Sequence, residues 1–192
     1  MLSKGLEWMR SKEHPKLPGS GSDDMTQLWR RKPNGHFWNV ATDFATPKAP
    51  ELLSGGILAD DMGLGKTLQI ISLILTGGPG TTLIIAPVSV MSNWGQQIQR
   101  HVKPEHCPRV IIYHGGKKMG AKELLEYDVV ITSYGKLSHD TSSGISLCSP
   151  KHKWRRVVLD EGHTIRNAKT KVAASACRLH AQSRWVLTGT PM

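Results

Sequence analysis

Short runs rich in Ile and Val alternate with longer stretches of helical pattern from residue 51 to the end of the chain. The apolar runs include TTLIIAPV, RVIIYHG, DVVITSY, WRRVVLD and RWVLTGT, and helical patterns at 93–101, in AKELLEY and at 170–180 lie between them. Strands that are apolar along their whole length are typical of parallel sheets covered by helices on both faces. We therefore predict an α/β fold with a doubly wound parallel sheet.

The first 50 residues have a different composition. Residues 15–50 are rich in Pro, Gly, Ser and Asn, and we expect them to form a loop with little regular structure. A length of 192 residues suits one domain with a small appendage. We place the boundary between residues 1–50 and a compact unit at 51–192.

The overall composition narrows the class of protein. Lys and Arg number 25 against 15 Asp and Glu, which gives a net charge of +10 and suggests a polyanionic partner such as nucleic acid. Three cysteines lie far apart without a CxxC pair, so we expect neither a disulfide framework nor a zinc site. The chain has no apolar run of about 18 residues and no signal peptide, and we expect an intracellular protein without a membrane span.

A glycine-rich segment, DDMGLGKT at 60–67, lies between the apolar run GGILAD and a helical pattern. Two glycines allow the backbone to turn so that N–H groups and the helix start face phosphate oxygens. Lys66 would then reach the β and γ phosphates, and the Thr67 hydroxyl would bind Mg²⁺. The complete motif has Gly where this chain has Asp60, so the match is limited to GxGKT. The alternative is an ordinary strand-to-helix turn with a surface lysine.

Asp160 and Glu161 directly follow the apolar run WRRVVL. The carboxyl ends of parallel strands share one edge of a sheet, where ligands bind. We expect Asp160 to hold Mg²⁺, directly or through water, and Glu161 to orient and deprotonate the attacking water. An acidic pair alone is commonly the solvated start of a helix, and the preceding GKT segment favours the catalytic interpretation.

Five segments together resemble a known family. ILADDMGLGKTLQ, LIIAPVSVMSNW, DVVITSYGKL, VVLDEGH and LTGTPM follow the order and approximate spacing of motifs I, Ia, Ib, II and III of the Swi/Snf family. This family comprises helicase-like, DNA-stimulated ATPases of helicase superfamily two. DEGH, RWVLTGTPM and the insertion before GGILADDMGLGKT are most similar to the subgroup of the helicase-like transcription factor and the yeast post-replication repair translocases.

The resemblance implies a RecA-like first lobe that binds ATP and Mg²⁺, a nuclear location, and double-stranded DNA as partner, in chromatin remodelling or DNA repair. The residues implied to contact the nucleotide are Asp61, Met62, Gly63, Leu64, Gly65, Lys66, Thr67 and Leu68, with Thr67 and Asp160 on the metal. Those implied to couple the nucleotide to DNA are His163, Thr188, Gly189 and Thr190. Those implied to contact DNA are Ser89, Asn93, Thr132, Ser133 and Tyr134; Pro87 and Trp94 also match motif Ia, and Trp94 and Tyr134 could equally be core residues.

Basic residues surround the strand that carries Asp160 and Glu161. The last 42 residues hold +7 of the net charge of +10. Lys151, Lys153, Arg155 and Arg156 precede the acidic pair, and Arg166, Lys169 and Lys171 follow it. We expect a surface that contacts DNA phosphates, with Arg155 and Arg156 as the leading candidates, or else an ordinary solvated face.

The resemblance also indicates what this chain lacks. It stops at Met192 inside motif III, so we expect no second lobe and no arginine finger, and hence weak ATP binding with very slow hydrolysis. GLEWM at 5–9 resembles the end of the family's Q motif, whose adenine-reading Gln is replaced near position 2 by Leu2. A truncated, non-catalytic module that binds DNA or a protein is the alternative. An unrelated P-loop phosphotransferase does not account for DEGH followed by LTGTP.

Overall fold

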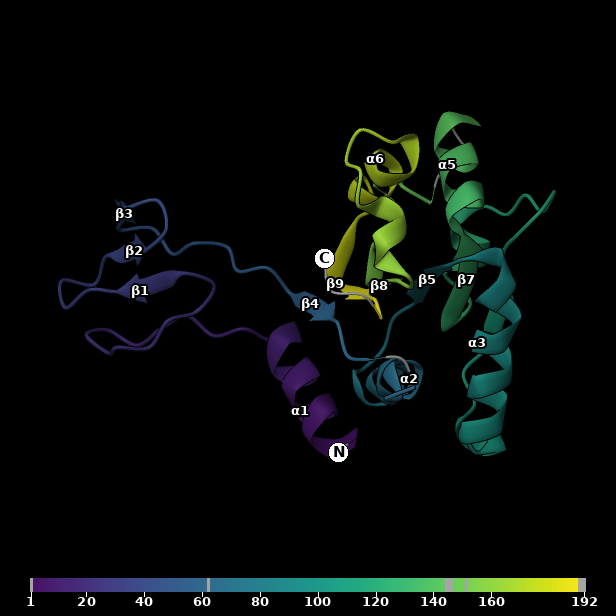
Figure 1. Cartoon of the computed structure of the whole chain (residues 1–192), viewed down its shortest axis with the longest axis horizontal. Helices are drawn as coiled ribbons and strands as arrows, with labels where there is room; N and C mark the ends of the chain where they lie inside the picture. The colour runs from purple at the N-terminus through teal and green to yellow at the C-terminus, as the bar shows by residue number, and fades with distance from the viewer. Residues whose placement is uncertain (1, 62, 144–146, 151, 190–192) are drawn as a thin grey trace.

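The computed structural model describes residues 2–61, 63–143, 147–150 and 152–189, and its centre is a six-stranded sheet between layers of helices (Figure 1). The strand order is β4-β9-β8-β5-β7-β6, and every neighbouring pair is parallel. The strands are β4 (Gly55–Leu58), β5 (Thr82–Ala86), β6 (Val110–Ile112), β7 (Val129–Ser133), β8 (Trp154–Leu159) and β9 (Ala181–Leu187). The predicted doubly wound, RecA-like α/β fold is confirmed.

The sheet separates two apolar clusters because successive side chains of a strand point to opposite faces. In β5, Ile84 and Ala86 enter one cluster, whereas Leu83 and Ile85 enter the other. The first cluster receives side chains from α1 (Leu2–Glu13), α2 (Lys66–Thr76) and α3 (Val88–His101). The second receives them from α4 (Ala121–Leu124), α5 (Tyr134–Ser143) and α6 (Lys171–Cys177). Two 3₁₀ turns, Pro104–His106 and Gly162–Ile165, complete the elements.

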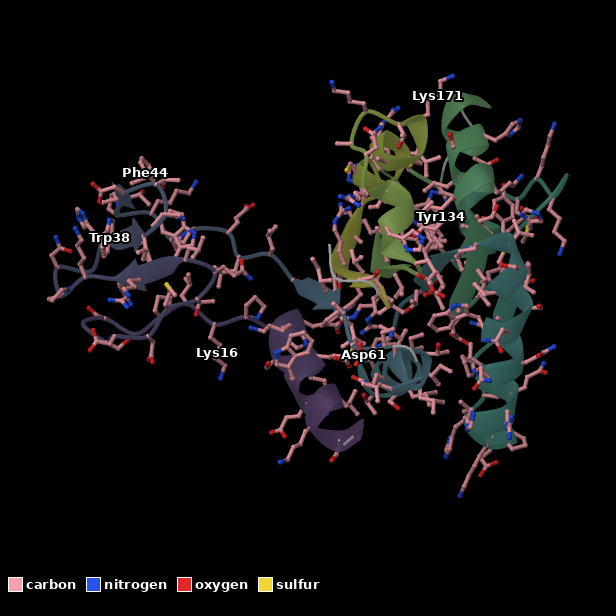
Figure 2. The ribbon with its side chains drawn as sticks, viewed as in Figure 1. Lys16, Trp38, Phe44, Asp61, Tyr134 and Lys171 are labelled. Carbon is pink, nitrogen blue, oxygen red and sulfur yellow. The ribbon has the colours of Figure 1, made fainter. Side chains whose placement is uncertain are left out.

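The segment at 15–50, predicted to have little regular structure, contains a small antiparallel sheet. Its strands are β1 (Trp29–Arg31), β2 (Phe37–Asn39) and β3 (Phe44–Thr46), paired in sequence order. The turn residues that suggested a loop connect these strands: Gly35, with φ of 84°, turns the chain between β1 and β2. The small sheet extends to one side of the large sheet, and Trp38 and Phe44 lie well away from Asp61 (Figures 1 and 2).

Helix α1 packs against the large sheet although it precedes the insertion. Met9 is fully buried in the first cluster, and the Glu13 carboxylate accepts hydrogen bonds from Arg156 of β8 and Trp185 of β9. Residues at the two ends of the sequence therefore share one core.

Among the described residues, Cys107, Cys148 and Cys177 form no disulfide bond. Within the described ranges, no helix combines the length and the apolar character that crossing a membrane requires.

Candidate functional site

The loop between β4 and α2 has an open, positively polarised backbone. Gly63 and Gly65 have φ of 84° and 81°, and apart from the adjoining residues no described heavy atom lies within 4 Å of a Cβ built at either position. Helix α2 starts without a side-chain cap, and its first helical hydrogen bond runs from the N–H of Gln69 to the carbonyl of Gly65. The N–H groups of the preceding residues thus have no acceptor within the helix and can face an anion.

Lys66 closes over this loop. Its Nζ donates to the carbonyls of Asp60 and Asp61 at 2.6 and 2.9 Å. An ammonium group held by two carbonyls can exchange them for phosphate oxygens without leaving the loop. The neighbouring residue predicted to bind nucleotide, Met62, lies outside the described residues.

Asp160 follows the end of β8, where three groups hold it. Its Oδ2 accepts from Trp94 Nε1 at 2.8 Å, its Oδ1 accepts from the N–H of Glu161 at 3.0 Å, and its carbonyl accepts from Tyr134 Oη at 2.6 Å. Burial raises the pKa of Asp160, the hydrogen bond from Trp94 opposes this, and the charge of Glu161 raises the pKa further. Burial, reinforced by the charges of Asp160 and Glu161, also raises the pKa of Tyr134, so its hydroxyl keeps the proton that it donates.

Glu161 adopts a left-handed backbone conformation, with φ of 52° and ψ of 55°. This conformation is uncommon for a residue other than glycine. Its Oε2 lies 3.3 Å from Nδ1 of the exposed His163. The next residue, Gly162, packs closely against β9, where an added Cβ would lie 2.2 Å from Cγ1 of Val186. The role of His163 in coupling this turn to motif III stays a prediction.

The end of β9 lies between the two parts of the site. Since β9 pairs with both β4 and β8, the glycine-rich loop and the Asp160 turn follow strands about 10 Å apart. The N–H of the buried Thr188 donates to the carbonyl of Leu58 in β4 at 3.2 Å. Gly189 follows it at the same edge, whereas Thr190 lies outside the described residues. Burial raises the pKa of Asp160, and the positive charge of Lys66 partly opposes this rise.

The ligands at this edge fit Mg²⁺ bound together with a nucleotide. Thr67, at the start of α2, and Asp160 offer a hydroxyl and a carboxylate, the hard oxygen ligands that Mg²⁺ prefers. The described part of the chain contains no group of three or more His, Cys, Asp or Glu that could hold a metal alone. Magnesium sites that share phosphate ligands need only one or two carboxylates, so this sparse set is sufficient.

A cavity of about 420 Å³ adjoins the glycine-rich loop. It lies between α1, the end of β4 and the start of α2, and its lining includes Trp8, Leu58, Leu64 and Gln69. The lining is mainly apolar with one buried amide, which suits a flat heterocycle.

The predicted DNA-contacting residues divide into exposed and buried ones. Ser89 and Asn93 are exposed and lie one helical turn apart on α3. The hydroxyls of Thr132 and Ser133 are buried, and they bond to the Tyr113 carbonyl and to His114 Nδ1, respectively. Tyr134 is also buried. The side chains at 132–134 thus bond within the protein interior, and contact between this segment and DNA stays a prediction.

The prediction that Arg156 contacts DNA is wrong. Its side chain is 1% exposed and forms a bidentate ion pair with Glu13. Arg155 is half-buried and donates to Gln182 Oε1 and to the carbonyl of Gly77. Both arginines belong to the beginning of β8, about 13 Å or more from Asp160 at its end. Lys153, Arg166, Lys169 and Lys171 are exposed, and Lys151 lies outside the described residues.

The structure reveals a basic loop that the sequence did not single out. Residues 114–120 follow the end of β6, at the same sheet edge as the starts of α3 and α5. Lys136 is buried and donates to the carbonyls of Gly115 and Lys117, which fixes the loop, while Lys117 and Lys118 remain exposed. The GGKK sequence was the available signal, but only the topology places it at the same sheet edge as Ser89.

Comparison with known proteins identifies the family. The sequence profile of the SNF2-related domain matches residues 3–192. The chain belongs to the SNF2-related family. This SNF2-related domain is similar to the putative SWI/SNF-related matrix-associated actin-dependent regulator of chromatin subfamily A member 3-like 1 of Arabidopsis thaliana, at 33% identity over 98% of this chain and 26% of that protein. It is similar to the DNA repair protein RAD5B of the same plant, at 35% identity over 81% of this chain and 15% of that protein.

Among solved structures, the SNF2-related domain is similar to the Sulfolobus solfataricus SWI2/SNF2 ATPase core in complex with dsDNA. The TM-score is 0.66 with 28% identity, over 99% of this chain and 31% of that one. The chain thus spans about a quarter or less of the length of these curated relatives and about a third of the solved ATPase core. The resemblance to the Swi/Snf family is confirmed.

Proposed function

We propose that this chain is the ATP-binding lobe of a DNA-dependent ATPase that moves along double-stranded DNA in the nucleus, in chromatin remodelling or DNA repair. The observation that carries the proposal is the placement of the glycine-rich loop and the Asp160 turn on either side of the end of β9. A phosphate chain with its cation fits this arrangement, because one side offers N–H donors and an ammonium and the other offers carboxylates.

Each part has a distinct role. Residues 61–68 bind the phosphates, with Lys66 on the β and γ groups, and Thr67 and Asp160 hold Mg²⁺. When bound, Mg²⁺ would neutralise negative charge on the phosphates. Glu161 orients the attacking water and accepts its proton. The base occupies the cavity beside Trp8 and Gln69.

In this proposal the DNA-binding surface lies at the same sheet edge. Ser89 and Asn93 are exposed near the start of α3, and Lys117 and Lys118 are exposed in the loop after β6. Hydroxyl, amide and ammonium groups suit contacts to phosphates that carry no base preference. The solved structure similar to this chain has double-stranded DNA bound, which supports the same partner class here.

Hydrolysis at a useful rate requires a second lobe. An arginine finger can contribute on the order of 10³ to 10⁵ in rate. We therefore expect this chain alone to bind ATP and to turn it over very slowly. Thr188, Gly189 and Thr190 would transmit the nucleotide state to such a second lobe and to DNA.

The test is single-turnover ATP hydrolysis with and without duplex DNA, in the wild type and in Glu161→Gln. The expected result is slow hydrolysis that Glu161→Gln abolishes while ATP binding persists. Glu126→Gln, at an exposed position outside the site, is the matched control and should behave like the wild type. DNA binding without any nucleotide binding would refute the ATPase and favour a non-catalytic module.

A further inference from the structure

Two aromatic side chains hold the turn at Asp160 from opposite faces of the sheet. Trp94 is 1% exposed and belongs to the apolar cluster that α2 and α3 cover. Tyr134, the first residue of α5, is 6% exposed and belongs to the cluster on the other face (Figure 2). The turn is thus held between two helices that both begin at the sheet edge proposed to face DNA.

The two contacts restrain different atoms of Asp160. Trp94 donates its indole N–H to the side-chain oxygen Oδ2 at 2.8 Å, and Tyr134 donates its hydroxyl to the main-chain carbonyl at 2.6 Å. The second carboxylate oxygen, Oδ1, accepts from the N–H of Glu161. A carboxylate has about four lone-pair sites, so two neutral donors fix its orientation and leave room for a cation.

We propose that Trp94 and Tyr134 are positioning residues that set the Asp160 carboxylate for Mg²⁺ and link its position to the DNA-facing end of α3. This inference rests on the proposed function. Trp94 directly follows the exposed Asn93 on the same rigid helix, so a displacement of α3 by DNA moves the indole N–H that holds Oδ2. If Trp94 had a purely structural role, only the packing of its ring in the core would matter, and the hydrogen bond from its N–H to Asp160 would not.

The chain contains a matched control for this contact. Trp185 is also fully buried and also donates its indole N–H to a carboxylate, that of Glu13, at 3.0 Å. Trp94→Phe and Trp185→Phe therefore remove the same kind of hydrogen bond and leave a similar gap in the same cluster. Only the first affects the carboxylate proposed to hold Mg²⁺.

The experiment measures the affinity of a non-hydrolysable ATP analogue with Mg²⁺ and with EDTA, each with and without duplex DNA. In Trp94→Phe, the enhancement of analogue binding by Mg²⁺ should fall roughly tenfold, which is the size expected for a lost hydrogen bond to a charged group. The affinity for the analogue in EDTA should stay unchanged. The effect of DNA on the Mg²⁺-dependent affinity for the analogue should shrink together with the Mg²⁺ enhancement, because coupling between two ligands is reciprocal. Trp185→Phe should retain both the Mg²⁺ enhancement and the effect of DNA, even where this substitution lowers the stability of the fold.

Tyr134→Phe provides a second variant that removes only a hydroxyl and should show a smaller loss in the same direction. Equal Mg²⁺ enhancement in the wild type and in both Trp94→Phe and Tyr134→Phe would overturn the inference while leaving the ATPase proposal intact. A wild-type chain that binds the analogue equally well with Mg²⁺ and EDTA would overturn the metal site itself and the inference with it.

Discussion

Arg156 donates to both carboxylate oxygens of Glu13, at 2.5 and 2.7 Å, and each side chain is only 1% exposed. The pair joins α1 to the beginning of β8, and Trp185 adds a third donor to the same carboxylate. Burial alone would raise the pKa of Glu13, but the hydrogen bonds and charge of Arg156, together with Trp185, hold it below its ordinary value. The segment that resembles the Q motif is thus fixed to the sheet by charge as well as by Met9.

Breaking this pair should destabilise the protein strongly. Glu13→Gln leaves the Arg156 guanidinium buried without a countercharge, and loss of one partner of a buried ion pair costs about 3–5 kcal/mol. Urea unfolding measures the change. The control is Arg109→Gln, which breaks an ion pair to Asp128 whose side chains are 68% and 47% exposed and should cost less than about 1 kcal/mol. Equal losses for both variants would show that α1 does not depend on the buried pair.

Acid should remove the contribution of Glu13 to the free energy of unfolding. Because the pKa of Glu13 in the folded state lies below its ordinary value of 4.5, the unfolded state binds the proton first as the pH falls. The stabilisation is therefore complete above about pH 5 and is lost below that, as the pH falls through the folded pKa. The free energy of unfolding of the wild type should decrease over this range more steeply than that of Glu13→Gln. Parallel curves for the two proteins would contradict the lowered pKa.

Gly162 is required by close packing. Its added Cβ would lie 2.2 Å from Cγ1 of Val186, and valine has little rotamer freedom to move away. Gly162→Ala should cost about 1–3 kcal/mol, and Val186→Ala in the same chain should recover part of that loss. Gly135→Ala, in α5 with open space around it, is the control and should be neutral or stabilising by up to about 1 kcal/mol. A double-mutant cycle without coupling would refute the contact.

The loop after β6 should contribute to DNA affinity through charge. Lys117→Gln and Lys118→Gln should each lower the slope of log affinity against log salt by about 1, with no dependence on sequence. Arg100→Gln, exposed in the last turn of α3 and away from its DNA-facing start, should leave the slope unchanged. Unchanged slopes in both lysine variants would place the DNA elsewhere.

The sequence predicted the parts of this fold that depend on local pattern. Apolar runs such as that of β5 and the strand-to-helix position of Lys66 are readable because burial and turn chemistry act over a few neighbouring residues. Arg156 was misjudged because its partner, Glu13, lies in a distant helix, and a basic run in the sequence does not reveal which side chain enters the core. From the sequence, Trp94 is either a DNA-contacting or a core residue, and the structure places its ring in the core. Its N–H also donates to Asp160, a bond that the sequence does not predict because the two residues lie far apart in the chain.

The small sheet at 15–50 was missed for a related reason. Its strands are only three residues long, and their turn residues dominate the composition of the segment. Pairing between them supplies the regular structure, and that pairing is not visible in periodicity over so short a length.

Equilibrium binding of a non-hydrolysable ATP analogue in the presence of Mg²⁺, compared between the wild type and Lys66→Ala, tests the central claim most directly. Lys66 is the only described lysine that bonds to the carbonyls of Asp60 and Asp61, so its removal should weaken binding at least about tenfold without unfolding the lobe. Lys103→Ala, exposed after α3, should bind like the wild type. Equal affinity in the wild type and Lys66→Ala would contradict a nucleotide site at the β4–α2 loop.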